Sequence, residues 1–214
     1  MGWRSERMKY KVELIPAKLA KEFVRTHHYS RGCHNGPAPC YGLYDNEELI
    51  GCLVFATPCS ENVRKSLFGP EYKDNVKELH RLVILDVTPK NTESWFIAKV
   101  LKRLQIDRPD LWGIISFADK TQGHYGTIYQ ATNALYCGTS SKATFYLDKD
   151  DRLRHPRQNG VNISLDEAKK RGWKPVKRDA KFRYVYIVGN RKEKRDRKKL
   201  LLLDNYDYPK ENKE

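Results

Sequence analysis

The chain has 214 residues, enough to bury one sizeable core but short for two full domains. Charged residues make up 32% and aromatic residues 11% of it, and the spread of aromatics along the sequence excludes a largely disordered chain. No apolar run approaches the roughly 20 residues that cross a bilayer. With no signal peptide before the five cysteines, we expect reduced thiols in a cytoplasm and no membrane partner.

Positive charge is concentrated toward the C-terminus. The net charge is +14, and residues 151–214 hold 20 Lys/Arg against 10 Asp/Glu. A positive field of this kind favours a polyanion such as DNA or RNA, although a solvated basic surface is the alternative. Because seven of the nine residues in 191–199 are Lys or Arg, we expect one folded domain over residues 1–190 and a basic tail over 191–214.

The first third of the chain predicts a strand, a helix, a loop and a hairpin. Residues 10–15 are typical of a strand, and apolar residues at helical spacing follow Pro16 to about Thr26. Residues 27–39 are rich in Gly, Pro and polar groups, which indicates a loop. The segments 40–44 and 49–55 flank a polar tetrapeptide, the pattern of an antiparallel hairpin with a four-residue turn.

Two units of strand, loop and helix come next. Residues 78–87 form an apolar strand that His80 and Arg81 interrupt, and a helix reaches about Ile106. Residues 113–118 form a second apolar strand, which we expect to be followed by a helix through Leu135. Two such units predict parallel or mixed pairing, hence an α/β fold with a central mixed β-sheet flanked by helices. Alternating residues after Lys181 predict a last strand.

An active-site layout follows the second apolar strand. Asp119 stands at the end of that strand, a Gly-bracketed turn follows, and Tyr129 lies one short helix later. Open α/β folds form their clefts at this carboxyl edge of the sheet. The alternative interpretation is that Asp119 caps a helix and Tyr129 is a core residue.

Three segments resemble the Mom family of phage DNA-modification proteins. Ala118-Asp119, Gly123-His124, Gly126 and Ile128-Tyr129-Gln130-Ala131 are similar to the signature of the family. His28-Tyr29-Ser30 resembles its early motif, and Glu78-Leu79-x-Arg81 followed by Ser94-Trp95 resembles its central strand and the start of the next helix. The order and spacing of these segments match over residues 10 to about 150.

This resemblance implies a GNAT-like acyltransferase fold and a catalytic domain over residues 1–190. The implied activity converts adenine to N6-carbamoylmethyladenine in double-stranded DNA, which protects the DNA from host restriction. Arg81 and Ser94 match positions implicated in acetyl-coenzyme A binding. GNAT enzymes carry a Gly-rich pyrophosphate loop here, whereas residues 86–93 contain no glycine; a helix N-terminus can still bind phosphate. The implied catalytic residues are His28, Tyr29, Asp119 and Tyr129.

The chemistry of the substrate assigns roles to these residues. A carboxylate such as Asp119 can accept a proton from the exocyclic amine of adenine. Because duplex DNA hides this amine in the base stack, the base must be flipped out, and an aromatic ring such as that of Tyr29 or Tyr125 can replace the lost stacking. The arginines that we expect to contact phosphates are Arg25, Arg31, Arg152, Arg154 and Arg157.

Three alternatives stay open at this stage. A conventional GNAT N-acyltransferase would act on a protein or a small amine, and a noncatalytic DNA-binding protein would need only the positive charge. Iron held by an Asp together with His27, His28 or His124 is a further option, because carbamoylmethylation is not simple acyl transfer. An adenine methyltransferase is disfavoured because no Asp-Pro-Pro-Tyr motif is present.

Overall fold

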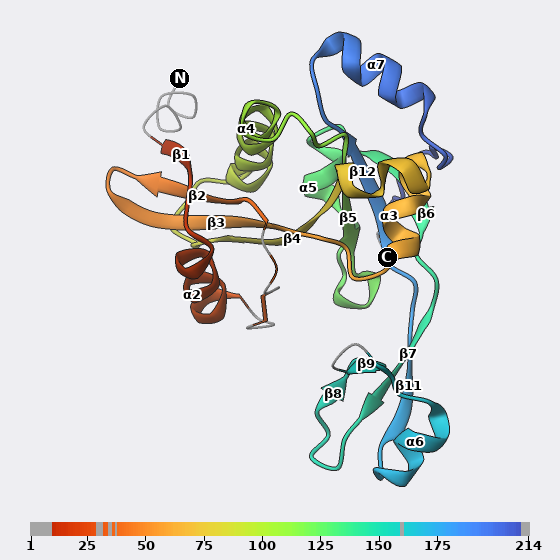
Figure 1. Cartoon of the computed structure of the whole chain (residues 1–214). Coiled ribbons are helices and arrows are strands. Elements are labelled where there is room, and N and C mark those ends of the chain that lie inside the picture. The colour runs from red at the N-terminus through yellow and green to blue at the C-terminus, as the bar shows by residue number, and fades with distance from the viewer. Residues whose placement is uncertain (1–9, 29–31, 34–35, 37, 159–160, 211–214) are drawn as a thin grey trace.

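The computed structural model describes residues 10–28, 32–33, 36, 38–158 and 161–210. Its largest feature is a seven-stranded sheet with the strand order β1-β2-β3-β4-β5-β12-β6 (Figure 1). These strands are β1 (Tyr10–Leu14), β2 (Cys40–Asp45), β3 (Glu48–Ala56), β4 (Val76–Ile84), β5 (Gly113–Ala118), β6 (Leu135–Thr139) and β12 (Phe182–Ile187).

Helices cover both faces of this main sheet. On one face α4 (Thr92–Asp107) and the short α5 (Thr127–Gln130) pack on a large apolar cluster; on the other lie α2 (Ala17–His27), α3 (Glu61–Phe68) and the 3-10 helix η2 (Pro70–Asn75). In β5, Ile114 joins the α4 cluster and its neighbour Ile115 joins the α3 cluster, as the alternation of a strand requires. The predicted α/β fold with a mixed central sheet flanked by helices is confirmed (Figure 1).

The two central strands, β4 and β5, pair over a short stretch only. They form the parallel pair of the main sheet, and their register covers Val76–Glu78 against Gly113–Ile115. Beyond this stretch β4 continues along β3 and β5 continues along β12. Where the strands part, the buried Ser116 hydroxyl donates to the carbonyl oxygen of Leu79 at 3.4 Å. Residues at the carboxyl ends of β4 and β5 therefore belong to two separate environments.

A smaller unit, here called the lobe, spans residues 143–178 and lies in the chain between β6 and β12. Its three-stranded sheet has the order β11-β7-β8, and α6 packs on it through Tyr146, Ile163, Ala168 and Trp173. In Figure 1 it extends away from the main sheet, below β5 and β12. Its elements are β7 (Ala143–Leu147), β8 (Leu153–Arg154), β9 (Arg157–Gln158), β10 (Val161–Asn162), α6 (Leu165–Lys170) and β11 (Lys174–Arg178).

The basic segment after residue 190 begins with a helix, α7 (Arg191–Lys199), which opens on a capping box formed by Asn190 and Glu193. Arg197 anchors this helix, because its guanidinium donates to the Val188 carbonyl at 2.5 Å and lies over the Trp112 ring. Beyond α7, backbone hydrogen bonds join residues 202 and 206 to the body of the protein. The expected division of the chain at residue 190 stays a prediction.

Two predicted elements differ from those observed. The expected helix through Leu135 is wrong: α5 ends at Gln130, Asn133 adopts a left-handed conformation with φ 60°, and Leu135 begins β6. The hairpin turn has two residues instead of four, because Asp45 pairs with Glu48. Over the described part of the chain, we find no helix with the length and apolar character needed to span a bilayer.

Candidate functional site

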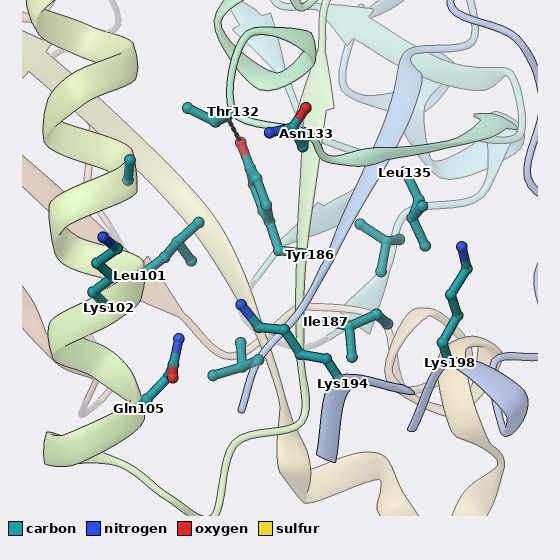
Figure 2. Close-up of a pocket in the computed structure, with 13 residues that line it drawn as sticks. Leu101, Lys102, Gln105, Thr132, Asn133, Leu135, Tyr186, Ile187, Lys194 and Lys198 are labelled. Atoms are coloured by element: carbon teal, nitrogen blue, oxygen red, sulfur yellow. Dashed lines mark hydrogen bonds between the residues drawn. The ribbon is translucent and has the colours of Figure 1, made fainter. Parts of the chain in front are cut away.

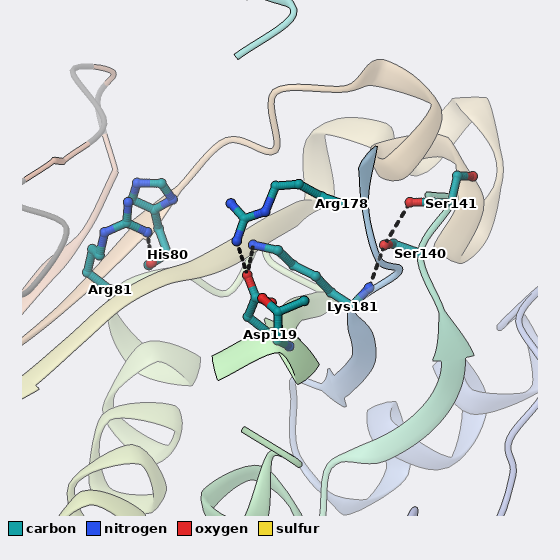
Figure 3. Close-up of polar contacts among 8 residues, drawn as sticks. His80, Arg81, Asp119, Ser140, Ser141, Arg178 and Lys181 are labelled. Carbon is teal, nitrogen blue, oxygen red and sulfur yellow. Dashed lines mark hydrogen bonds and ion pairs between the residues drawn. The ribbon is translucent and has the colours of Figure 1, made fainter. Parts of the chain in front are cut away.

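Two polar clusters lie on the central strands, one along the middle of β4 and the other at the carboxyl end of β5. The His28 cluster consists of His28, Glu78, His80 and Arg81, and the Asp119 cluster consists of Asp119, Thr121, Arg178 and Lys181. Figure 3 shows His80 and Arg81 on β4 and, at the end of β5, Asp119, on which the side chains of Arg178 and Lys181 converge.

A β-bulge shapes the His28 cluster. Val54 and Phe55 of β3 pair with Arg81 and Leu79 of β4, so His80 is an extra residue in β4. A bulge re-aims the side chains around it and is common next to active sites. Arg81 donates from Nε to the Gly32 carbonyl at 2.8 Å and from Nη1 to the His80 carbonyl at 2.7 Å. The guanidinium therefore ties β4 to the loop that follows α2.

His28 directly follows α2, where its backbone N–H donates to the carbonyl of Val24 at 2.9 Å. Burial lowers the pKa of its imidazole to about 4, and the charges of Arg81 and His80 act in the same direction. Nδ1 of His80 lies 3.5 Å from a carboxylate oxygen of Glu78. His28 is therefore neutral at physiological pH and retains an unprotonated ring nitrogen.

Asp119 is surrounded by donors. Its Oδ1 accepts hydrogen bonds from the backbone N–H and the hydroxyl of Thr121, at 3.1 and 2.6 Å. Its Oδ2 lies 2.9 Å from Nη2 of Arg178 and 3.4 Å from Nζ of Lys181. Burial alone would raise the pKa of this carboxyl, but the Thr121 hydrogen bond and the charges of Lys181 and Arg178 outweigh it, so the pKa is lowered.

The Asp119 cluster also connects the lobe to the main sheet. Arg178 ends β11, the last strand of the lobe, and Lys181 directly precedes β12. Asp119 also caps the 3-10 helix η3 (Lys120–Gln122), as the alternative interpretation of the sequence proposed. Both carboxylate oxygens of Asp119 therefore have partners, and Oδ2 binds two cations from a distant part of the chain.

Tyr129 lies in the apolar core on the α4 side of the main sheet. Its side chain is 9% exposed, and its ring centroid is 5.3 Å from that of Tyr184. The Tyr184 hydroxyl donates to the Tyr125 carbonyl and accepts from the Gln130 amide at 3.1 Å, which fixes the turn before α5. Gly126 is required in this turn, because its φ is +74° and a Cβ there would lie 2.7 Å from Cζ of Tyr184.

The predicted site residues do not form a single group. The structure brings His28 and Arg81 together, places Asp119 in the second cluster and buries Tyr129 in the core. Tyr29 lies outside the described residues. Ser94 is in the first turn of α4, where its hydroxyl donates to the Asn91 carbonyl at 3.0 Å.

The predicted phosphate-binding arginines have different surroundings. Arg25 is exposed in the last turn of α2, and Arg152 is exposed 3.8 Å from Asp150. Arg154 donates to the Asp148 carboxylate at 2.7 Å, and Arg157 donates to the carbonyl of residue 59 at 3.4 Å. Arg154 therefore stabilises the turn between β7 and β8. Arg31 lies outside the described residues.

The histidines and acidic residues do not assemble a metal site in the part of the chain that the structure describes, where no group of three His, Cys, Asp or Glu side chains is placed to hold an ion. The His27 ring packs on Phe23 with centroids 4.6 Å apart, and His124 is exposed.

Sequence reasoning missed Arg178 and Lys181. Both belong to the basic second half of the chain, and no local pattern distinguishes them from the many lysines and arginines around them. His80 and Glu78 did carry a signal, because polar residues interrupt an otherwise apolar strand there. Their closeness to His28 depends on the loop after α2, which pattern analysis does not place.

A cavity of about 450 Å³ lies away from both clusters, between α4, β12 and α7 (Figure 2). One wall carries the hydrogen-bonded hydroxyls of Tyr186 and Thr132, which are 2.5 Å apart. Lys102, Lys194 and Lys198 surround its mouth (Figure 2). None of the predicted site residues lines it.

Solved structures with a similar arrangement include acetyltransferases. The ribosomal-protein-S18-alanine N-acetyltransferase from Escherichia coli is 6% identical, with 84% of this chain and 94% of that chain covered and a TM-score of 0.48. A GNAT family acetyltransferase from Elizabethkingia anophelis with acetyl-CoA bound is 11% identical, with 84% and 99% covered and a TM-score of 0.43. At such identities and scores, these likenesses carry no conclusion about ligand or reaction.

Sequence comparison is more informative. The chain is 28% identical over 214 residues to "Methylcarbamoylase mom" of Escherichia phage Mu, an alignment that covers 96% of this chain and 86% of the relative. The model of the Mom protein family matches residues 9–210. This match spans the main sheet, both polar clusters and the lobe. The chain therefore belongs to the Mom protein family.

Proposed function

We propose that this chain is a transferase that attaches a carbamoylmethyl group to N6 of adenine in double-stranded DNA and so protects phage DNA from restriction in the host cytoplasm. The observation that carries the proposal is the family match over residues 9–210, together with a relative that is named a methylcarbamoylase. The neutral His28 imidazole beside the bulge in β4 supports it, because the reaction has to remove a proton from an amine.

We assign the proton acceptor to His28. When N6 displaces the leaving group from the methylene carbon of a carbamoylmethyl donor, the electrons of the broken bond depart with that group and the nitrogen acquires positive charge. Its N–H then becomes strongly acidic, so even a base with a pKa of about 4 can take the proton. Arg81 and His80 lower the pKa of the same imidazole and keep it unprotonated before the reaction. Tyr29 follows His28 in the sequence and is outside the described residues, so its proposed stacking on the flipped base stays a prediction.

Asp119 is less suited to proton transfer. A proton on its carboxylate would weaken the interactions with both Arg178 and Lys181, which the lowered pKa opposes. We propose that it acts as a positioning residue, which holds the lobe next to the end of β5. The proposed catalytic role of Tyr129 stays a prediction, and the residue packs in the apolar core on the α4 side of the main sheet.

The residues predicted for acetyl-coenzyme A do not form a pyrophosphate site. Arg81 is directed toward Gly32 on the α2 side of the main sheet, whereas Ser94 belongs to α4 on the opposite side. The first turn of α4 also carries Glu93, whose charge opposes an anion there. We therefore derive no step of the reaction through acetyl-coenzyme A.

Nucleoside analysis tests the proposed function. The full chain is expressed in bacteria, plasmid DNA is digested to nucleosides, and modified adenosine is identified by its mass. We expect a carbamoylmethyl increment that is lost with His28→Ala and kept with His27→Ala, because His27 is exposed on the last turn of α2. Unmodified adenosine in the presence of soluble wild-type protein would refute the proposal; acetylation of a protein or small amine would favour the conventional acyltransferase instead.

A further inference from the structure

We propose that one face of the sheet in the lobe is the surface on which the target DNA docks. This inference rests on the proposed function and adds to it the element that holds the substrate. The face, here called the open face, carries the side chains of Phe145, Leu147, Leu153, Lys174, Val176 and Arg178. Cross-strand pairing places them together, since Phe145 is opposite Val176, and Leu147 is opposite both Lys174 and Leu153.

Only the other face of this sheet is covered by α6. Tyr146 points to that side, where it is 4% exposed and its hydroxyl donates to the carbonyl of Ile163 at 3.2 Å. Because side chains alternate along a strand, Phe145 and Leu147 point to the opposite side. Leu153 is 46% exposed, and none of the side chains of the open face belongs to an apolar cluster in the described ranges.

The open face combines an aromatic platform with positive charge. The rings of Phe145 and His155 meet edge to face with centroids 5.0 Å apart, and the Arg178 guanidinium lies 5.3 Å from the centre of the Phe145 ring. The lobe contains 10 Lys/Arg against 5 Asp/Glu. Surfaces that bind unpaired nucleotides combine aromatic rings, which stack on bases, with cations that contact the phosphates, and the flipped adenine of the proposed reaction is such an unpaired base.

Two contacts hold the lobe against the main sheet. Arg178, on the open face, reaches Asp119 at the end of β5 (Figure 3), and Arg157 reaches the carbonyl of residue 59 after β3. These two contacts fix the lobe beside the carboxyl ends of β5 and β3, and clefts form at the carboxyl ends of sheet strands in α/β folds. DNA on the open face would therefore lie next to the Asp119 cluster.

The charge of the lobe favours DNA over a second copy of the chain. A symmetric dimer through this face would bring the patch that carries Lys174 and Arg178 against the same patch of the other copy, and like charges across an interface oppose association. A polyanion gains from the same charges through the release of counterions.

Two lysines on β11 provide a matched test. Lys174 lies opposite Leu147 on the open face, whereas Lys177 lies opposite Thr144 on the other face, and both are exposed. Binding of the full-length chain to a fluorescent duplex oligonucleotide is measured by anisotropy over a series of salt concentrations. We expect Lys174→Ala to weaken binding severalfold and to lower the slope of log affinity against log salt by about 1, with a much smaller change for Lys177→Ala.

Phe145→Ala tests the aromatic platform: with a duplex that carries one unpaired adenine, we expect a loss of affinity on the order of tenfold. If this variant fails to fold, Leu153→Ser, at an exposed position, and Lys174→Ala still test the surface. Equal binding by the wild-type, Lys174→Ala and Leu153→Ser proteins would overturn the inference, as would a stable dimer that Leu153→Ser disrupts. Because DNA binding is measured separately from adenosine mass, loss of the proposed reaction and failure of this surface are distinguishable.

Discussion

The two polar clusters belong to neighbouring strands, but one favours the ionised form of its titratable residue and the other favours the neutral form. In the Asp119 cluster two cations surround one carboxylate, which is held ionised and engaged through both oxygens. In the His28 cluster the cationic Arg81 lies near an imidazole that is held neutral. The first arrangement resists a change of protonation, and the second keeps a ring nitrogen unprotonated. This difference supports the proposal that proton transfer takes place on the β4 side and that the β5 side positions the lobe.

Removal of the imidazole should have the largest effect. We expect His28→Ala to lower the rate of adenine modification by about 100-fold to 10,000-fold, the usual contribution of a general base, while the protein stays folded. The amount of modified adenosine per plasmid, followed over time, measures this loss, and circular dichroism checks the fold. A rate within a few-fold of wild type would show that the base lies elsewhere and would remove the distinction between the clusters.

Neutralising Asp119 should have a smaller and different effect. Asp119→Asn retains an acceptor for Thr121 but loses the charge that attracts Arg178 and Lys181. We expect DNA to bind roughly tenfold more weakly, which corresponds to a loss of about 1.4 kcal/mol of binding free energy. Turnover at saturating DNA should change less than the affinity. Asp179→Asn is the control, because its partner Lys142 is exposed. Loss of turnover at unchanged affinity would instead make Asp119 a catalytic residue.

The pH dependence of stability should separate the two clusters. The imidazole of His28 binds a proton near pH 6.5 in the unfolded chain but only near pH 4 in the folded protein, so acid favours unfolding between these values. The Asp119 carboxyl has a lowered folded pKa, so its contribution is present above pH 3.8 and is lost as the pH falls through that lowered value.

Urea unfolding at several pH values measures this difference. From pH 6.5 down to pH 4, we expect the wild-type protein to lose more unfolding free energy than His28→Gln, which cannot take up the proton. Parallel curves for the two proteins over this interval would contradict the neutral state of His28 in the folded protein.

How well the sequence predicts a feature of the structure depends on how far apart in the chain the contacting residues are. Local apolar patterns predict the strand β5 (Gly113–Ala118) and the helix α4, each with an end within two residues of the observed one. The end of α5 was missed because Asn133 adopts a left-handed conformation that an apolar pattern does not register. The position of Asp119 at the end of an apolar strand and the resemblance both led to this residue, but its partner Arg178 lies 59 residues further along the chain. A contact of that range depends on the placement of the lobe.

The smallest effect is expected where β4 and β5 part. Ser116 is fully buried, and its hydroxyl donates to the Leu79 carbonyl at 3.4 Å. Ser116→Ala removes the donor and leaves that carbonyl in an apolar environment, which should cost about 1 kcal/mol of unfolding free energy. For a chain of this size, that corresponds to a fall in Tm of about 2–4 °C.

Thermal unfolding of Ser116→Ala, with the exposed Ser141→Ala as control, measures this cost. Because both polar clusters keep their own contacts, modification of adenine should stay within a few-fold of wild type. A loss of activity as large as that of His28→Ala would mean that the Ser116–Leu79 contact sets the spacing of the two clusters. In that case they would act as one unit, and the separation of proton transfer from positioning would have to be abandoned.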